Sequence, residues 1–332
     1  MSDSFFELTP DLVLAAVEAS GLRCNGRCIP LNSYENRVYE LELEEDESED
    51  GAAKHVISRR RVVKFYRPGR WSRDQILEEH QFLQDLLEDE VPVVAPIRFP
   101  NGETLHSAQE SGLWYTVFPK VGGRIPDEMD EDQLQWLGRL LGRIHNVGAS
   151  RKGLYRLSLT PATYGTSNLE YLLANNWLPP NLRERYASAV REICRLAEAP
   201  FASVAPIRLH GDCHRNNLLW GTQGPFFLDF DDMVIGPPVQ DLWLLVPGRD
   251  SEARLHLDSL IRGYEEFRTF DRASLKMIEI LRALRFVHFS AWMARRWEDP
   301  AFPRAFPYFN TPKYWEDQTR DVMDQAERIQ TA

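Results

Sequence analysis

The chain has 332 residues, of which 43% are hydrophobic and 27% charged, and its formal net charge is −11. This length and composition allow two compact domains and exclude a largely disordered or fibrous protein. The acidic balance argues against nucleic acid or an anionic membrane as partner, and no run approaches the roughly 20 apolar residues that span a bilayer.

The first 118 residues predict a small lobe of strands and helices. Pro10 before and Gly21 after a periodic segment bound a short helix over 11–19. Apolar and polar residues then alternate, or apolar runs occur, in several short segments. We expect strands at 22–31, 38–43, 56–66, near Ile97 and at 113–118.

Residues 44–50 form an acidic run between two of these expected strands. Six of its seven residues are Asp or Glu. Such runs are usually solvated, so we interpret the segment as the exposed tip of a hairpin.

A helix is expected to begin after Ser72, because Gln75 three residues later completes a capping box. Glu79 falls on the apolar stripe of this helix, and an unpaired buried carboxylate costs several kcal/mol. Lys64 lies in the apolar strand before it. Each residue offers the other a partner, so the sequence predicts a Lys64–Glu79 ion pair.

After Pro119–Arg124, a connector that contains two glycines, the chain becomes helical. Apolar residues recur at helical spacing in several segments. These segments are 132–145, 171–173, 182–197, 254–267 and 275–297. Residues 207–236 interrupt the pattern with strand-like runs rich in polar groups.

The interruption contains the residues best suited to chemistry. Asp212 and Asn217 are five residues apart, and Asp229 follows twelve later, after an apolar hairpin. Mg²⁺ prefers oxygen ligands and is usually held by one or two carboxylates plus substrate phosphates. Asn217 and Asp229 suit that cation, and Asp212 suits a hydroxyl proton. The alternative is a polar turn in which these residues serve as caps.

Several motifs resemble the aminoglycoside phosphotransferase and choline kinase-like superfamily. They are His-Gly-Asp-Cys-His-Arg-Asn-Asn at 210–217, Leu-Asp-Phe at 228–230 and Asp-Leu-Trp at 241–243. Longer strings, such as VVKFYRPGRW at 62–71, resemble its bacterial serine/threonine protein kinases of stress responses. The resemblance covers essentially the whole chain. It implies an α+β, bilobal protein kinase-like fold, with a small mixed β-sheet N-lobe (1–118) and a larger, mostly helical C-lobe (119–332).

The resemblance also implies roles for individual residues. Asp212 and Asp229 are the catalytic residues, and Asn217 and Asp229 hold Mg²⁺. Ser33, Lys64 and Glu79 bind ATP or position the residue that does. The chain departs from the protein-kinase pattern because it has no G-x-G-x-x-G, and Asn32–Asn36 stands in its place.

The implied activity is ATP- and Mg²⁺-dependent transfer to Ser/Thr of a protein substrate, by a cytoplasmic monomer. Three alternatives for the function stay open at this point: a kinase of choline, homoserine or amino sugars; a two-metal hydrolase that uses His210, Asp212, His214, Asp229, Asp231 and Asp232; and a non-catalytic binding module. For the helix 281–297, its arginines could steer an acidic or phosphorylated partner. For these arginines we expect pairing with the chain's own acids. The cysteines, Cys24, Cys28, Cys194 and Cys213, indicate free thiols, and we interpret Cys213 and His145 as core residues.

Overall fold

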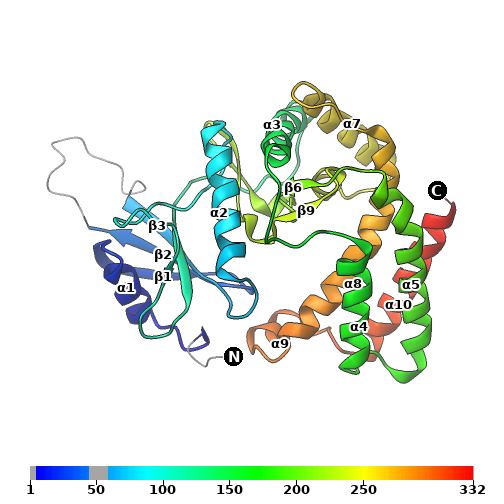
Figure 1. Cartoon of the computed structure of the whole chain (residues 1–332), viewed down its shortest axis with the longest axis horizontal. Helices are drawn as coiled ribbons and strands as arrows, with labels where there is room; N and C mark the ends of the chain where they lie inside the picture. Colours follow the sequence, from blue (N-terminus) through cyan, green and yellow to red (C-terminus); the bar gives the residue numbers. More distant parts are fainter. Residues whose placement is uncertain (1–4, 45–58, 332) are drawn as a thin grey trace. The chain divides into compact units, whose positions relative to one another are not determined.

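The computed structural model describes residues 5–44 and 59–331, and it confirms the predicted α+β class (Figure 1). Packing divides the chain into two compact units. The sheet unit extends to Asp130 and also includes His214–Asp232. The helical unit consists of Glu131–Cys213 and the residues from Met233 onward. The short segment from His214 to Asp232 therefore packs with the sheet, although the residues on both sides of it belong to the helical unit.

The sheet unit contains a five-stranded sheet in the order β1-β2-β3-β5-β4. All the pairings among its described strands are antiparallel, whereas the resemblance implied a mixed sheet. The strands are β1 (Cys24–Leu31), β2 (Arg37–Leu43), β3 (Arg60–Phe65), β4 (His106–Ser107) and β5 (Trp114–Pro119). Beyond Glu44, the acidic run lies outside the described residues.

The strand predicted near Ile97 is wrong. This segment is irregular, although the Ile97 amide still donates to the Val117 carbonyl oxygen at 2.8 Å. Pro96 and Pro100 flank it, and proline has no N–H to donate to a strand ladder. The short β4 occupies the edge of the sheet beside β5 instead.

Two helices, α1 (Pro10–Ala19) and α2 (Arg73–Glu88), complete the first part of the sheet unit. The predicted capping box of α2 is present: the Gln75 amide donates to Ser72 Oγ at 3.2 Å, and the Ser72 amide donates to Gln75 Oε1 at 2.9 Å. This cap satisfies two of the amides that a helix start leaves unpaired. It also fixes the register that places Glu79 on the buried face.

A small hairpin brings the 214–232 segment into the same unit. Its strands are β7 (Leu218–Gly221) and β8 (Gly224–Phe227), between the 3₁₀ turns η4 (Arg215–Asn217) and η5 (Phe230–Asp232). The Phe230 ring packs edge-on against Phe82 of α2, with ring centroids 5.8 Å apart. The hairpin and the helix that carries Glu79 are thus held together by a buried aromatic contact.

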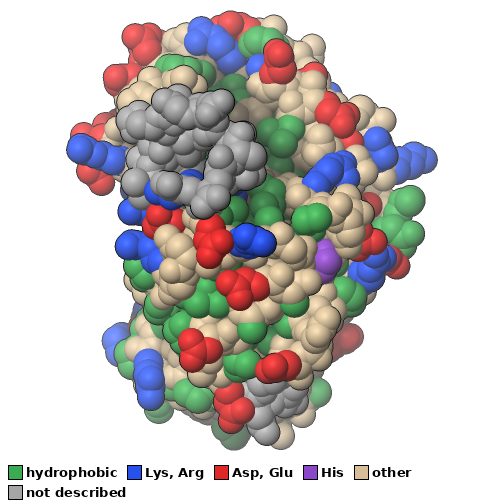
Figure 2. Space-filling view, turned by 90° about the vertical axis from the view of Figure 1, so that its left-hand side faces the viewer, with side chains coloured by type: hydrophobic (Ala, Val, Ile, Leu, Met, Phe, Trp, Pro, Cys, Tyr) green, Lys and Arg blue, Asp and Glu red, His purple; other side chains and the backbone are tan. Residues whose placement is uncertain are grey.

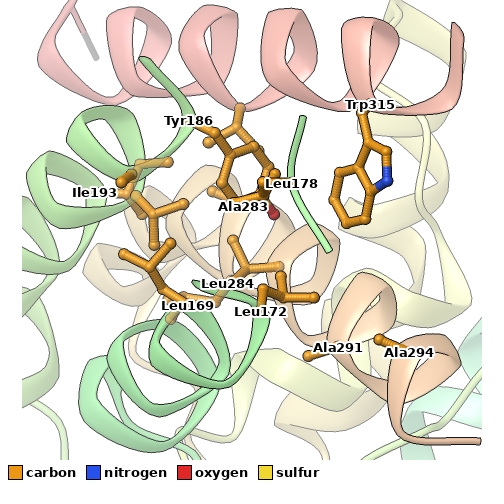
Figure 3. Close-up of a cluster of buried hydrophobic side chains, with 14 of the residues drawn as sticks. Leu169, Leu172, Leu178, Tyr186, Ile193, Ala283, Leu284, Ala291, Ala294 and Trp315 are labelled. Atoms are coloured by element: carbon orange, nitrogen blue, oxygen red, sulfur yellow. The ribbon is translucent and has the colours of Figure 1, made fainter. Parts of the chain in front are cut away.

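The helical unit is built from long amphipathic helices and one short strand pair. The helical elements are α3 (Glu131–Ser150), η3 (Pro161–Thr166), α4 (Ser167–Ala174), α5 (Pro180–Ala202), α6 (Val239–Leu245), α7 (Ser251–Glu265), η6 (Arg272–Met277), α8 (Ile278–Arg296), α9 (Ala301–Ala305) and α10 (Pro312–Thr331). The strands β6 (Ile207–Leu209) and β9 (Val234–Gly236) pair antiparallel. Figure 3 shows a buried hydrophobic cluster of this unit, to which α5 contributes Tyr186, α8 contributes Ala283 and Leu284, and α10 contributes Trp315.

Helices α3 and α7 lie side by side in close contact (Figure 1). A Cβ added at Gly138 of α3 would lie 2.0 Å from the Leu260 carbonyl oxygen, and one added at Gly263 of α7 would lie 2.0 Å from that of Gln135. Only residues without a side chain permit backbones to approach so closely. The glycines therefore set the spacing of these two helices.

We expect Gly138→Ala to lower the free energy of unfolding by about 2 kcal/mol, because overpacking against backbone outweighs alanine's higher helix propensity. The control is Gly122→Ala, where the added Cβ meets no atom within 4 Å and the expected change is within about 0.5 kcal/mol. Urea unfolding followed by circular dichroism measures both. Equal stability of the two variants would show that the close approach has no energetic consequence.

The surface carries charges of both signs. Figure 2 shows Lys and Arg side chains lying among Asp and Glu side chains over the face in view. Within residues 5–44 and 59–331, no helix combines the length and the apolar character that crossing a bilayer requires.

Candidate active site

Lys64 and Glu79 form the predicted ion pair. Lys64 lies on the central strand β3, opposite Val38 of β2 and Thr116 of β5. Its Nζ is 3.2 Å from Oε1 of Glu79, and the two residues are 5% and 0% exposed. Both charges are removed from water, so each depends on the other for compensation.

Asp231 is a second partner of Lys64 that the sequence reasoning misses. Its Oδ1 lies 3.3 Å from Lys64 Nζ, and its Oδ2 accepts a hydrogen bond from Asn36 Nδ2 at 3.1 Å. Burial alone would lower the pKa of Lys64, but the carboxylates of Asp231 and Glu79 outweigh it and hold that pKa well above its ordinary value. These two carboxylates therefore favour the charged ammonium form of Lys64.

Arg70 completes this buried network. Its guanidinium bonds to the carboxylates of both Asp231 and Asp232. These are two of the acids that the two-metal hydrolase alternative assigns to metal. Because they pair with Lys64 and Arg70 instead, the structure does not favour that alternative. Among the described residues, no group of three or more His, Cys, Asp or Glu side chains is arranged to hold a metal ion.

The loop that contains Ser33 joins β1 to β2 and is tied to the same network. Arg67 donates from Nε to the Glu35 carbonyl oxygen and from Nη2 to that of Tyr34, both at 2.9 Å. Asn36 at the end of the loop reaches Asp231, as described above. The loop has no glycine pattern, so these side-chain bonds fix its backbone in place of glycine-rich geometry.

Asn217 and Asp229 stand at the same end of the β7–β8 hairpin. The Leu228 amide donates to the Asn217 carbonyl oxygen at 2.9 Å, which places the residue after Leu228 beside Asn217. The Asp229 backbone has a φ of 54°, a left-handed conformation that is uncommon outside glycine. Its side chain is 56% exposed, and its Oδ1 lies 3.8 Å from Lys64 Nζ. Asp229 is thus an accessible carboxylate, whereas Asp231 is buried.

Asp212 belongs to the helical unit, in the loop after β6. Asp241 of α6 braces this loop: its two carboxylate oxygens accept the amides of His210 and Gly211, each at 2.9 Å. The Gln240 side chain donates to the Gly211 carbonyl oxygen at 3.1 Å, and Gly211 has a φ of 85°. The backbone just before Asp212 is therefore held on both its amide and its carbonyl side.

His145 of α3 supports that brace and is a fully buried core residue, as predicted. Its Nε2 lies 3.1 Å from Asp241 Oδ2, and its Nδ1 lies 2.9 Å from the Tyr264 hydroxyl. Burial lowers the pKa of His145, and Asp241 only partly opposes this. A neutral ring with its proton on Nε2 satisfies both contacts, since it donates to Asp241 and accepts from Tyr264.

Three arginines of α8 have polar or acidic partners within the helical unit. Arg282 lies 3.5 Å from Glu279 and also donates to the Pro247 carbonyl oxygen. Arg295 donates to Asn168 Oδ1 at 2.8 Å. Arg285 contacts Asp212, with Nη2 and Oδ1 2.8 Å apart. The predicted pairing with the chain's own acids is confirmed for Arg282 and Arg285, whereas Arg295 bonds to an amide.

Comparison with known proteins assigns the family. Residues 27–278 match the sequence profile of the phosphotransferase enzyme family. Stress response kinase A of Escherichia coli (strain K12) is 42% identical over 98% of this chain and 95% of its own length. The serine/threonine protein kinase RdoA of Salmonella typhimurium (strain LT2) is 41% identical over 97% of this chain and 94% of its own length. The chain belongs to the phosphotransferase family.

A solved structure confirms the kinase-like fold of this phosphotransferase. The amicoumacin kinase hAmiN, in complex with AMP-PNP, Ca²⁺ and Ami, superposes with a TM-score of 0.74 at 18% identity. The match covers 98% of this chain and 96% of that one. The fold is therefore shared although the sequences have diverged widely.

The residues of the phosphotransferase fit a hard cation held jointly with a nucleotide. Asn217 and Asp229 offer oxygen donors, and the exposed Asp229 carboxylate is accessible to a ligand. Mg²⁺ usually takes one or two carboxylates and completes its shell with phosphate oxygens and water. The ammonium group of Lys64, 3.8 Å from Asp229 Oδ1, suits an anionic phosphate chain.

Because the pKa of His145 is lowered in the folded phosphotransferase, stability should depend on pH. Below about pH 6.5, the ordinary pKa of histidine, the unfolded chain binds a proton that the native chain does not. The free energy of unfolding therefore decreases as the pH is lowered, by at most about 1.4 kcal/mol per pH unit. Urea unfolding between about pH 7.5 and 5.5 measures this slope. His145→Gln should reduce it by that amount, and an unchanged slope would contradict the assignment.

Proposed function

We propose that this phosphotransferase is an ATP- and Mg²⁺-dependent serine/threonine protein kinase that acts in a bacterial stress response. The observation that carries the choice of acceptor is the identity of about two residues in five, over almost the entire chain, to proteins named stress response kinase A and serine/threonine protein kinase RdoA. The hAmiN structure shares only the fold, so its small-molecule ligand does not bear on this choice.

In the sheet unit, we assign residues to the nucleotide. Lys64 binds the α- and β-phosphates, and Glu79 and Asp231 position its ammonium group. Ser33 offers its hydroxyl and amide to the phosphates from the β1–β2 loop. Asn217 and Asp229 hold Mg²⁺, which would neutralise charge on the phosphate oxygens.

In the helical unit, we assign the acceptor to Asp212. Its carboxylate orients the Ser or Thr hydroxyl and accepts the hydroxyl proton as the oxygen attacks the γ-phosphorus of ATP. An O–P bond to the acceptor forms, the bond between the γ-phosphorus and the bridging oxygen breaks, and ADP leaves with the bonding electrons. Because Asp241 fixes the loop backbone, the carboxylate is held ready without reorganisation.

We also propose that residues 1–118 act as the nucleotide-binding lobe and residues 119–332 as the catalytic and substrate-binding lobe of a cytoplasmic monomer. The boundary between the two compact units, after Asp130, lies close to the proposed one, but residues 214–232 belong to the sheet unit. All four cysteines are free thiols, which agrees with a reducing compartment. Cys213 is buried, and burial raises the pKa of its thiol well above the ordinary value, so it fits a core filler.

A competition of acceptors tests the proposed function. The purified chain is incubated with γ-labelled ATP and Mg²⁺, together with casein, choline, homoserine or an aminoglycoside, and the products are separated. Label on phosphoserine or phosphothreonine of the protein, absent with Asp212→Asn, is the expected result. Faster transfer to one of the small molecules than to protein would contradict the proposed acceptor while leaving the phosphotransferase family intact.

A further inference from the structure

Arg285 of α8 lies in direct contact with the side chain of Asp212. Its Nη2 lies 2.8 Å from Asp212 Oδ1, and the two side chains are 36% and 23% exposed. Asp212 is the residue to which we assign the acceptor hydroxyl. A guanidinium in direct contact with it therefore lies within reach of the atoms that flank that hydroxyl.

Both partners of this contact come from fixed elements. Asp212 follows the loop that Asp241 and Gln240 hold, and Arg285 projects from α8, whose neighbouring residues Leu284 and Val287 are buried in the core. The contact thus reflects the packing of the helical unit. Asp212 and Arg285 both belong to that unit.

Two other arginines of α8, Arg282 and Arg295, have different surroundings. Arg282 packs over the Trp243 ring at 5.0 Å and bonds to the Pro247 carbonyl oxygen. Arg295 packs over Tyr171 at 4.3 Å and bonds to Asn168. These side chains anchor α8 to its neighbours. Arg285 instead brings its positive charge to a carboxylate that we assign to the reaction.

The chemistry of a guanidinium indicates what this charge selects. It carries five N–H donors in a planar fork, and Asp212 Oδ1 takes one of them. The fork matches carboxylate and phosphate geometry, and its charge repels cations. An acceptor with a carboxylate or phosphate beside its hydroxyl is attracted, whereas choline or an amino sugar, which carries a cation there, is repelled.

We propose that Arg285 is a specificity residue that selects acceptor hydroxyls flanked by a negative charge, namely Ser or Thr next to an acidic or phosphorylated side chain. The inference rests on the proposed function and narrows its substrate class. Arg285 exchanges part of its bonding from Asp212 to the anionic group of the substrate. Asp212 then faces the hydroxyl while the neighbouring anion holds the peptide in register.

Three peptides test the proposal with a single variable. They share one Ser in a neutral sequence, and the residues on either side of it are Glu, Gln or Lys. Wild type and the variants Arg285→Gln, Arg285→Lys and Arg285→Glu are compared by kcat/KM on each peptide, at low and high salt. Arg191→Gln is the matched control, because Arg191 lies on the exposed surface of α5 with its side chain 60% exposed.

We expect wild type to prefer the Glu peptide over the Gln peptide by about tenfold, the size of one charge-assisted hydrogen bond. Arg285→Gln should remove the preference, Arg285→Glu should reverse it toward the Lys peptide, and Arg285→Lys should keep part of it. Arg191→Gln should leave it unchanged. High salt should weaken the preference in wild type, since the groups are partly exposed.

Two outcomes would overturn the inference while the proposed function stands. One is equal use of the three peptides by wild type. The other is an equal loss on all three peptides in Arg285→Gln, which would mean that Arg285 only positions Asp212. A wild-type enzyme that phosphorylates none of the peptides or casein but does phosphorylate a small molecule would overturn the proposed function as well. Thermal unfolding and ATP binding of each variant verify that it is folded.

Discussion

Replacing Asp212 by Asn is expected to lower phosphoryl transfer by at least about 10²-fold, the usual contribution of a positioned base. The amide of Asn keeps the shape of the side chain but cannot accept the hydroxyl proton. The variant also loses the ion pair with Arg285. Because both side chains are partly exposed, that loss costs at most about 1 kcal/mol of stability.

The variant should therefore stay folded and should still bind ATP·Mg²⁺, since the residues assigned to the nucleotide lie in the sheet unit. Isothermal titration with a non-hydrolysable ATP analogue measures binding, and a γ-labelled ATP assay measures transfer. The matched control is Asp258→Asn, an aspartate of α7 with its side chain 53% exposed, which should transfer at the wild-type rate. Near wild-type turnover by a folded Asp212→Asn would remove Asp212 from the mechanism.

Lys64→Met is the second substitution with a large expected effect. It should destabilise the protein by about 3–5 kcal/mol, because removing one partner of a buried ion pair leaves uncompensated charge. Here two carboxylates, those of Glu79 and Asp231, lose their ammonium partner at once. Phosphoryl transfer should also fall, since nothing then replaces the positive charge assigned to the α- and β-phosphates.

The double variant Lys64→Met/Glu79→Gln measures the interaction energy between the two residues. Because the two residues are in contact, their combined destabilisation should be smaller than the sum of the single effects. Lys313→Met is the control: Lys313 pairs with Asp317 at 2.9 Å but is 81% exposed on its side chain, so its loss should cost less than about 1 kcal/mol. Strictly additive losses for Lys64 and Glu79 would show that they do not act as a pair.

Local sequence signals were sufficient for the Lys64–Glu79 pair. The capping box at Ser72 fixes where α2 begins, and helical periodicity then places Glu79 inward. The alternation of β2 and the apolar run of β3 likewise follow from residue pattern. These features depend on neighbours within a few residues, which is why a single sequence predicts them.

Long-range packing decided what the sequence could not reveal. Three acids, Asp229, Asp231 and Asp232, occur within four residues, and no local pattern tells which one is buried. Asp231 is buried because Asn36 and Arg70, 195 and 161 residues away in the chain, meet it. The contact of Arg285 with Asp212 depends in the same way on α8 packing in the helical core.

The helices and strands also differ in how far the local sequence pattern predicts them. Helix α10 is amphipathic, with its apolar residues spaced among many charged ones, and it lies beyond the segments for which the sequence pattern predicts helices. Its Trp315 is buried and packs edge-on against Tyr186 of α5. Near Ile97 the apolar residues suggested a strand, but the flanking prolines prevent a regular ladder.

The most direct test of the account follows both products of the reaction by ³¹P NMR. The wild-type chain is supplied with ATP, Mg²⁺ and a protein acceptor, and the signals of ADP, inorganic phosphate and phosphate ester are recorded over time. We expect ADP and a phosphoserine or phosphothreonine ester to grow in equal amounts, and both to form at least about 10²-fold more slowly with Asp212→Asn. Inorganic phosphate growing in step with ADP, with no ester on the protein, would contradict it.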